Sequence, residues 1–488
     1  MTSFFSTQIT RNTSRFISGF SLGSYLLFYL FFALYDGVVI GVDSPTYIGM
    51  SFSREPFYPL LLAFFRLFNA GRYLQYVVIF QSILMAAAGW ALADYLRKTL
   101  KLHYLYSSLL YLFPPVTSLL CRFAAGRKSM FTNSILSEGI ATSLYLLFIL
   151  FLFRYLLEKR TLYLMLSALL AFLMISTRKQ MLMVIPLLIL GIIFSGLLKR
   201  KEEAASTGSA RKVLPTIGKG ILQAALISLF ILLAANLLDC SYNYLLRGQF
   251  TRHSSDNRFL TTMIFYNARE TDADYIKDEE IRTLFLEIYS VCEEKGYLGS
   301  QAEEGWLNKV NHFGDHYDHI QIDTMWPMIL KKAEENIGTQ NVALKDLESD
   351  RINRVMIQSI LPHQLPQLFY TLVNNFLSGL VITVAQLKPV FIVYSIFIYL
   401  AYIILFVRLW VIHQRKPSDS CLYTLLFSGL TLMGIVSNLT LVSAVIFCQT
   451  RYTIYNMPLF YMAGALLLYF NMAPVIAKLY PKKKDRGF

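Results

Sequence analysis

Charge is scarce in this sequence. Charged residues make up 16% of the 488 positions, whereas an average soluble domain has about 25%. Hydrophobic residues make up 55%, and they gather in runs of about 20, the length that a helix needs to cross the hydrocarbon core of a bilayer. Helices satisfy their own backbone hydrogen bonds in that core. The runs therefore predict an all-α, polytopic membrane protein.

Three other features are missing. The five cysteines include no Cys-x-x-Cys pair, which argues against a disulfide framework or a thiolate zinc site. No small-residue cleavage pattern follows the first apolar run, so we interpret that run as a retained span and not as a signal peptide. No internal repeat is visible, although many transporters are built from repeats.

The positive charge is unevenly distributed. Residues 241–388 hold 14 Lys/Arg and 20 Asp/Glu, a net charge of −6, whereas the rest of the chain holds 31 and 11, a net charge of +20. The basic residues outside 241–388 are spread over many short loops and form no single stripe, which argues against a nucleic-acid partner. Loops rich in Lys and Arg are typical of the cytoplasmic side of a membrane. Both termini are therefore predicted to be cytoplasmic, in a multi-pass protein of the cell (plasma) membrane.

Ten apolar runs are predicted to span the membrane. They are residues 20–42, 74–95, 104–120, 136–156, 161–177, 180–198, 219–238, 389–411, 421–446 and 454–473. Three parts follow from their order. Residues 1–238 form a membrane core of about seven spans with an outer loop at 43–73, residues 239–388 form an extracytoplasmic, mainly helical insert, and residues 389–488 form about three more spans with a basic cytoplasmic tail.

Two apolar segments do not fit this count. Residues 56–68 are too short to span and are predicted to lie in the outer interface. Residues 367–387 are long enough to span. Counting them, however, would place Arg415 and the basic tail on the opposite side from the other basic loops. We therefore predict an interfacial or re-entrant helix that ends the insert.

The first outer loop carries the most informative charge. Asp43 lies at the mouth of the first predicted span, and ionisable residues at membrane depth are functional candidates because they are costly to keep there. The simpler interpretation is an acid that ends the helix in the wet headgroup layer. Asp36 lies inside the same predicted run, so either the span ends sooner, near Tyr35, or Asp36 competes for the same role.

The loop and three later segments resemble the polytopic glycosyltransferases of the GT-C superfamily, which includes protein O-mannosyltransferases and the lipid A aminoarabinose transferase. The loop has an Asp, a Tyr four residues on, and then Arg-x-Pro-x-Tyr-Pro before an apolar helix. The matching residues are Asp43, Tyr47, Arg54, Pro56, Tyr58 and Pro59. Similar pieces follow at Glu138, at STRKQMLMVIPLLIL (176–190) and at RYTIYNMPLFY (451–461). The resemblance covers about residues 1–200 and the final span, and it leaves the insert unmatched.

The resemblance implies an inverting transfer from a polyprenyl-phosphate sugar to an extracytoplasmic acceptor, with Asp43 as the general base. A carboxylate can take the proton that the acceptor hydroxyl loses. The leaving phosphate is anionic and needs cations. The residues predicted to contact substrate are Tyr47, Arg54, Tyr58, Arg122, Arg127, Glu138, Arg178, Lys179 and Arg451. For the basic residues, contact with membrane-lipid headgroups is the simpler alternative. In parts of the family the acid that matches Glu138 orients an arginine or binds a metal ion. The alternative for Glu138 is a charge that favourably starts a helix.

A histidine-rich stretch lies in the insert. His312, His316 and His319 share one face of a predicted helix, and such a face can bind zinc or another divalent ion. Gly314 weakens this helix and no known motif spacing is matched, so no cofactor is certain and a divalent metal ion is only one option. Contact with substrate from this face, or from Arg252, His253 and Arg258, is the alternative.

Other functions fit parts of the pattern. A polysaccharide polymerase or ligase also has many spans and a large outer loop, and a transporter or lipid flippase is the rival from another class. A transporter is expected to have charged or broken helices near the midplane, whereas residues 180–198, 221–235 and 454–470 contain no charge at all. An inactive relative that only binds lipid is the remaining alternative.

Overall fold

The structure is a computed structural model that describes residues 11–124, 128–207, 213–254, 256–339 and 341–479. Within these ranges every regular element is a helix, and the only extended pairing is an isolated parallel bridge between Val39 and Ser134. The prediction of an all-α fold is confirmed.

Eight helices of the described chain are long and apolar enough to cross a membrane. They are α1 (Arg11–Tyr35), α4 (Tyr73–Thr99), α6 (Glu138–Glu158), α8 (Val184–Thr207), α9 (Val213–Arg247), α14 (Val342–Val384), α15 (Pro389–Arg415) and α16 (Asp419–Ser443). Several long apolar helices of this kind are what a multi-pass membrane protein requires.

The eight helices are not the same set as the ten predicted runs. Helices also form at three further runs, as α5 (Tyr104–Ala124), α7 (Thr161–Ile175) and α18 (Met457–Leu479), but these are not among the eight. In contrast, α14 is among them although no span was predicted there. The count of about ten crossings stays a prediction.

The first helix ends earlier than predicted. α1 stops at Tyr35, not near residue 42, and Gly37 follows with a left-handed φ of 64°. A glycine in this conformation is a common helix terminator. The Asp36 carboxylate is then held outside the helix by the Arg122 guanidinium and by the backbone N–H of Met130.

The segment 367–387 does not form a helix of its own, and its interfacial or re-entrant position stays a prediction. α14 is one helix of 43 residues that joins this segment to the amphipathic stretch before it. Its C-terminal part packs on α16, where the Asn375 side chain donates to the carbonyl of Ile446 at 2.6 Å. The carbonyl of Val384, the last residue of α14, accepts from the hydroxyl of Tyr461 in α18. The helix therefore ends beside the start of α18.

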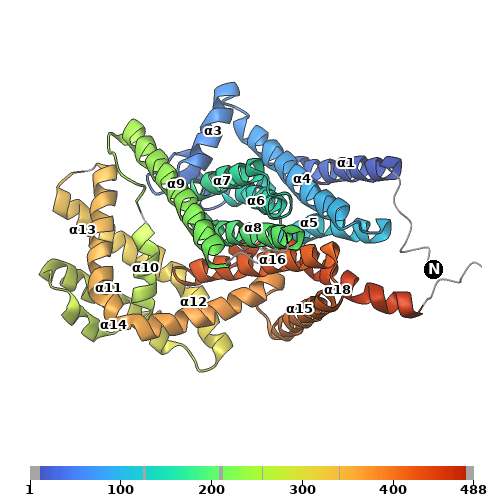
Figure 1. Cartoon of the computed structure of the whole chain (residues 1–488). Coiled ribbons are helices and arrows are strands. Elements are labelled where there is room, and N and C mark those ends of the chain that lie inside the picture. The colour runs from blue at the N-terminus through green and yellow to red at the C-terminus, as the bar shows by residue number, and fades with distance from the viewer. Residues whose placement is uncertain (1–10, 125–127, 208–212, 255, 340, 480–488) are drawn as a thin grey trace, which may run out of the picture.

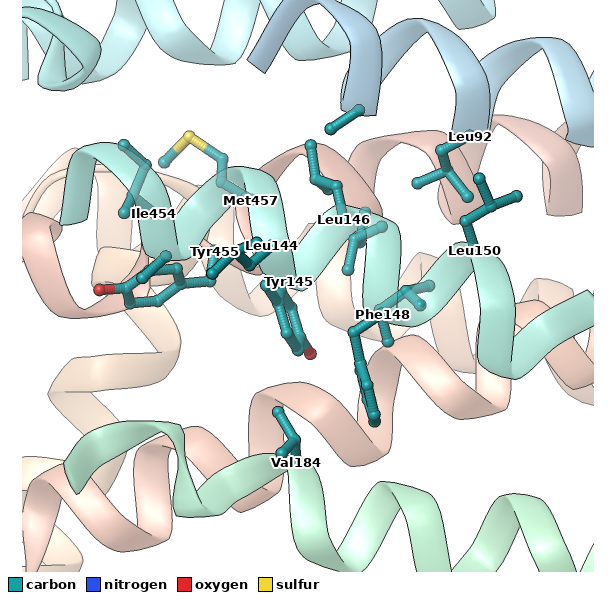
Figure 2. Close-up of a cluster of buried hydrophobic side chains, with 14 of the residues drawn as sticks. Leu92, Leu144, Tyr145, Leu146, Phe148, Leu150, Val184, Ile454, Tyr455 and Met457 are labelled. Atoms are coloured by element: carbon teal, nitrogen blue, oxygen red, sulfur yellow. The ribbon is translucent and has the colours of Figure 1, made fainter. Parts of the chain in front are cut away.

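The hydrophobic core is divided in two. One core fills the helix bundle, where Tyr145, Phe148 and Tyr455 point into the space between the helices (Figure 2). The second lies among α10 (Asp256–Tyr266), α11 (Glu279–Glu294), α12 (Trp306–Asp318), α13 (Trp326–Ile337) and the first part of α14. A π-helical segment, His319–Met325, joins α12 to α13.

Figure 1 shows α10 to α13 gathered at one end of the bundle. We call this the insert end. The start of α1 and the C-terminal part of α18 lie at the opposite end (Figure 1), which we call the terminal end. The insert contacts the bundle through Tyr317, whose hydroxyl donates to the carbonyl of Val445 at 2.7 Å. The loops at the insert end are therefore covered by a second packed unit.

Candidate functional site

The loop after α1 is fixed to the start of α6. The Ser44 hydroxyl accepts from the Gly41 N–H at 2.8 Å and donates to the carbonyl of Ile135 at 2.9 Å. Pro45 favours the start of the short helix α2 (Ser44–Ile48), because its fixed φ suits the first helical turn. These contacts place Asp43, at the N-cap of α2, at the insert end of the bundle.

Asp43 is bound by two guanidinium groups. Its Oδ1 lies 2.7 Å from Nη2 of Arg54, and its Oδ2 lies 3.1 Å from Nη1 of Arg451. Burial raises the pKa of Asp43, but the two arginines outweigh this effect and hold the pKa at about 2. The carboxylate is therefore ionised at any physiological pH.

Aromatic side chains hold Arg54 in place. Its guanidinium lies 4.5 Å from the ring centre of Tyr47, and its Nε donates to the Thr46 hydroxyl at 2.7 Å. The hydroxyl of buried Tyr47 is 3.0 Å from that of Ser137. Tyr58 lies one layer deeper, where its hydroxyl donates to the side-chain oxygen of Gln81. Tyr47 thus contacts a charged residue of the site, whereas Tyr58 packs beneath it.

A second buried acid lies beside the first. Glu138 begins α6 with its side chain 3% exposed, and its Oε1 lies 2.6 Å from Nη1 of Arg178. The same oxygen is 3.9 Å from Nε of Arg451. Arg178 and Arg451 both lie over the ring of Tyr452, at 4.9 and 4.7 Å. Because Arg451 also contacts Asp43, it bridges the two acids.

The structure thus brings together five of the residues that the sequence singled out. We call them the charge cluster: Asp43, Arg54, Glu138, Arg178 and Arg451. Asp43 and Arg54 lie in the connection between α1 and α3 (Phe57–Phe68), Arg178 lies in the turn after α7, Arg451 lies in the short helix α17 (Thr450–Thr453), and Glu138 starts α6. Within these five residues three guanidinium groups face two carboxylates, and guanidinium groups are suited to an anionic ligand. Two further carboxylates are close, because Glu55 acts on Arg54 and Asp318 is influenced by Arg451.

The other predicted site residues lie elsewhere or are not described. Arg122 pairs with Asp36 and forms no ion pair with the residues of the charge cluster. Arg127 lies outside the described residues. Lys179 is next to Arg178, and its backbone N–H donates to a carboxylate oxygen of Glu55 at 2.7 Å. This bond ties the first loop to the turn that carries Arg178.

The three histidines of the insert do not form a metal site. The rings of His312 and His316 stack with their centres 4.2 Å apart, and His312 Nε2 is hydrogen-bonded to the carbonyl of Gly296. His319 Nδ1 lies 2.6 Å from a carboxylate oxygen of Asp323. No group of three His, Cys, Asp or Glu within the described ranges is arranged to hold a metal ion. The suggestion of a metal site at His312, His316 and His319 is therefore not supported.

Two hollows lie near the charge cluster. A cavity of about 20 Å³, lined by Glu138, Tyr29 and Thr142 among others, has room for about one water molecule. An open cleft of about 500 Å³ lies between residues 49–52, Arg247 and residues 341–343. Only the cleft has the size of a ligand pocket, and its wall belongs to the same loop as Asp43 and Arg54.

Sequence reasoning overlooked several residues of this region. The guanidinium groups of Arg178 and Arg451 both lie over the ring of Tyr452. Tyr452 directly follows Arg451, so the Arg-Tyr dipeptide was the sequence signal that could have identified it. Asp318 lies in the histidine-rich stretch. Burial raises its pKa, and Arg451 and Asp43 are close enough to shift it in opposite directions. Asp318 therefore faces the charge cluster from the insert.

Comparison of the chain with protein-family models, curated proteins and solved structures finds no match. The functional argument therefore depends on the geometry of the charge cluster.

Proposed function

We propose that the protein is a GT-C-like membrane glycosyltransferase that moves a sugar, with inversion, from a polyprenyl-phosphate donor to an extracytoplasmic acceptor. α5, α7 and α18 add to the crossings, and the insert faces away from the cytoplasm. The observation that carries this proposal is Asp43, an ionised carboxylate in the first loop between Arg54 and Arg451, with the Glu138–Arg178 pair beside it.

The proposed step uses the acids and the arginines differently. The acceptor hydroxyl oxygen attacks the anomeric carbon, the bond from that carbon to the phosphate oxygen breaks, and the hydroxyl proton passes to Asp43. The polyprenyl phosphate leaves as an anion that Arg178 and Arg451 stabilise. Glu138 orients these two guanidinium groups. The direct test is release of labelled sugar from a polyprenyl-phosphate donor in reconstituted vesicles, and absence of both donor binding and sugar release would contradict the proposal.

Asp43 must become more basic before it can act. A carboxylate with a pKa of about 2 accepts a proton poorly, because general bases work best with a pKa near the operating pH. A bound phosphate competes for the guanidinium group of Arg451. As this contact shifts from Asp43 to the phosphate, the pKa of Asp43 rises. Donor binding thereby activates the base.

The pH profile tests this account. In the free protein Asp43 is ionised above a pKa of about 2, so kcat/KM is expected to show no acid limb from Asp43 between about pH 4 and 7. Arg54→Gln removes a positive charge and raises the Asp43 pKa, so the acid limb moves to higher pH. Arg54→Lys keeps the charge and is the matched control. A profile of Arg54→Gln that does not shift relative to Arg54→Lys would contradict the role of Asp43.

The orientation is tested with single cysteines. Ser300 is exposed in the insert, Ser418 is exposed at the start of α16, and all five native cysteines are buried, so background labelling is low. A cysteine at 300 is expected to react with an impermeant maleimide in intact cells, and one at 418 only after the inner face is opened. Reaction of position 300 from the cytoplasmic side alone would reverse the orientation and exclude the extracytoplasmic acceptor.

A further inference from the structure

Arg258 of α10 forms no ion pair with any carboxylate of the described residues. Its Nε is enclosed and has no hydrogen-bond partner among them, and its guanidinium lies on the rings of Trp326 at 4.8 Å and Phe259 at 5.4 Å. Burial lowers the pKa of Arg258, which reflects the cost of keeping this charge out of water. The three arginines of the charge cluster, in contrast, each contact a carboxylate.

Arg258 follows four residues after Ser254, whose backbone N–H donates to the carbonyl of Phe52 in the wall of the open cleft at 3.1 Å. Arg54 and Asp43 are close enough for their charges to act on its pKa, and so is Asp346 of α14. Asp346 is in turn influenced by Arg258 and by Arg247. Arg247 lines the cleft of about 500 Å³. The two arginines therefore mark a route from the cleft towards Asp43.

The route reaches the side of the cluster on which an acceptor must lie. Successive ion pairs link the cluster residues in the order Arg54, Asp43, Arg451, Glu138 and Arg178. Arg258 is therefore at the end of the cluster that holds Asp43, and Arg178 is at the opposite end. In an inverting transfer the attacking hydroxyl and the leaving phosphate lie on opposite sides of the anomeric carbon. A group bound near the base therefore belongs to the acceptor.

We propose that Arg258, together with Arg247 in the cleft, binds an anionic group of the acceptor, so that the acceptor is a phosphate- or carboxylate-bearing molecule that enters from the cleft. This inference rests on the proposed function. Trp326 supports it by holding the Arg258 guanidinium on its ring. The local backbone is also unusual, because the π-helical segment that precedes Trp326 is of a kind found mostly at functional sites.

The test measures two bindings on the full-length protein in detergent. Glycerol 1-phosphate is the probe for the acceptor position, and polyprenyl phosphate is the probe for the donor position. Arg258→Gln is expected to weaken glycerol 1-phosphate binding by about 10- to 150-fold, the loss of one charge-assisted contact, and to leave polyprenyl phosphate binding unchanged. Arg258→Lys retains part of the affinity, and Arg282→Gln is the matched control, because Arg282 is a half-exposed arginine of α11 whose ion pairs with Asp274 and Glu279 lie on the surface of the insert.

Each outcome has a distinct meaning. Equal binding of glycerol 1-phosphate by the native protein and Arg258→Gln, or no binding at all, overturns the acceptor subsite. Loss of polyprenyl phosphate binding in Arg258→Gln moves Arg258 to the donor and also overturns it, while the glycosyltransferase proposal stands. Failure of the native protein to bind polyprenyl phosphate or release sugar contradicts the proposed function itself. Among the described residues the Arg258 side chain makes no ion pair or hydrogen bond, and Arg258→Gln loses only its contacts with the rings of Trp326 and Phe259, so its unfolding temperature is expected to stay close to that of the native protein. An unfolding temperature far below the native value would assign Arg258 a structural role and overturn the proposal.

Discussion

Asp43→Asn is expected to lower sugar transfer by about 10²–10⁴-fold, the range typical of a lost general base. Asparagine keeps the shape of the side chain and cannot take the acceptor proton. The same change releases Arg54 and Arg451 from their carboxylate partner, so binding of the donor lipid is expected to stay equal or become tighter. Transfer is followed with a labelled polyprenyl-phosphate sugar in reconstituted vesicles, and donor affinity is measured separately.

Two variants make this experiment specific. Asp36→Asn is the matched control, because Asp36 is a buried acid at the same end of the bundle that pairs with Arg122 outside the charge cluster. It is expected to retain transfer. Asp43→Glu keeps the charge but moves the carboxylate by about an ångström, a misplacement that can cost about 10²-fold. Native transfer by Asp43→Asn, or loss of transfer by Asp36→Asn alone, would shift the role away from Asp43.

Arg178→Ala is expected to have the largest effect on stability. It leaves the buried carboxylate of Glu138 with the Ser137 hydroxyl at 3.3 Å and the longer contact to Arg451 at 3.9 Å. Removal of one partner from a buried ion pair typically costs about 3–5 kcal/mol. Donor binding is expected to fall as well, by about 10- to 150-fold for one charge-assisted contact. Thermal unfolding and polyprenyl phosphate binding are measured on the same preparation.

The double variant Glu138→Gln/Arg178→Ala separates these two effects. Neutralising Glu138 removes the unpaired charge, so much of the lost stability is expected to return, while the loss in donor affinity persists. A double variant that recovers both would show that Arg178 acts only as the partner of Glu138. Equal stability of Arg178→Ala and the native protein would mean that the ion pair contributes nothing to the fold.

Apolar run length predicted most of the helices but not where they end. The first run was drawn to residue 42, with an earlier end near Tyr35 as the alternative, and α1 ends at Tyr35. Asp36 is bound there by Arg122, a residue far away in the sequence. The segment 367–387 was separated from the amphipathic stretch before it because their compositions differ. Both belong to α14, since an apolar half can pack on α16 while the other half packs in the insert.

The charge cluster was predicted as a set of residues but not as a set of contacts. The resemblance placed Asp43, Glu138, Arg178 and Arg451 in the outer loops, but spacing along the chain gives no information on which arginine meets which acid. The bridging position of Arg451 depends on the packing of α16 against α8 and α18. Arg258 was named from the sequence as a possible substrate contact, but its lack of an ion-pair partner among the described residues is a property of the folded chain.

The π-helical segment His319–Met325 makes the face of α13 sensitive to chain length. Each residue of an α-helix turns the chain by about 100°. A protein that lacked one residue here and closed the segment into regular α-helix would rotate α13 by about that angle relative to α12. The Trp326 ring would then no longer lie under the Arg258 guanidinium. The side chain of the residue next to Trp326 would lie there instead. A one-residue deletion is thus a route by which descendants of this chain could change what the insert presents to the charge cluster while keeping the same helices.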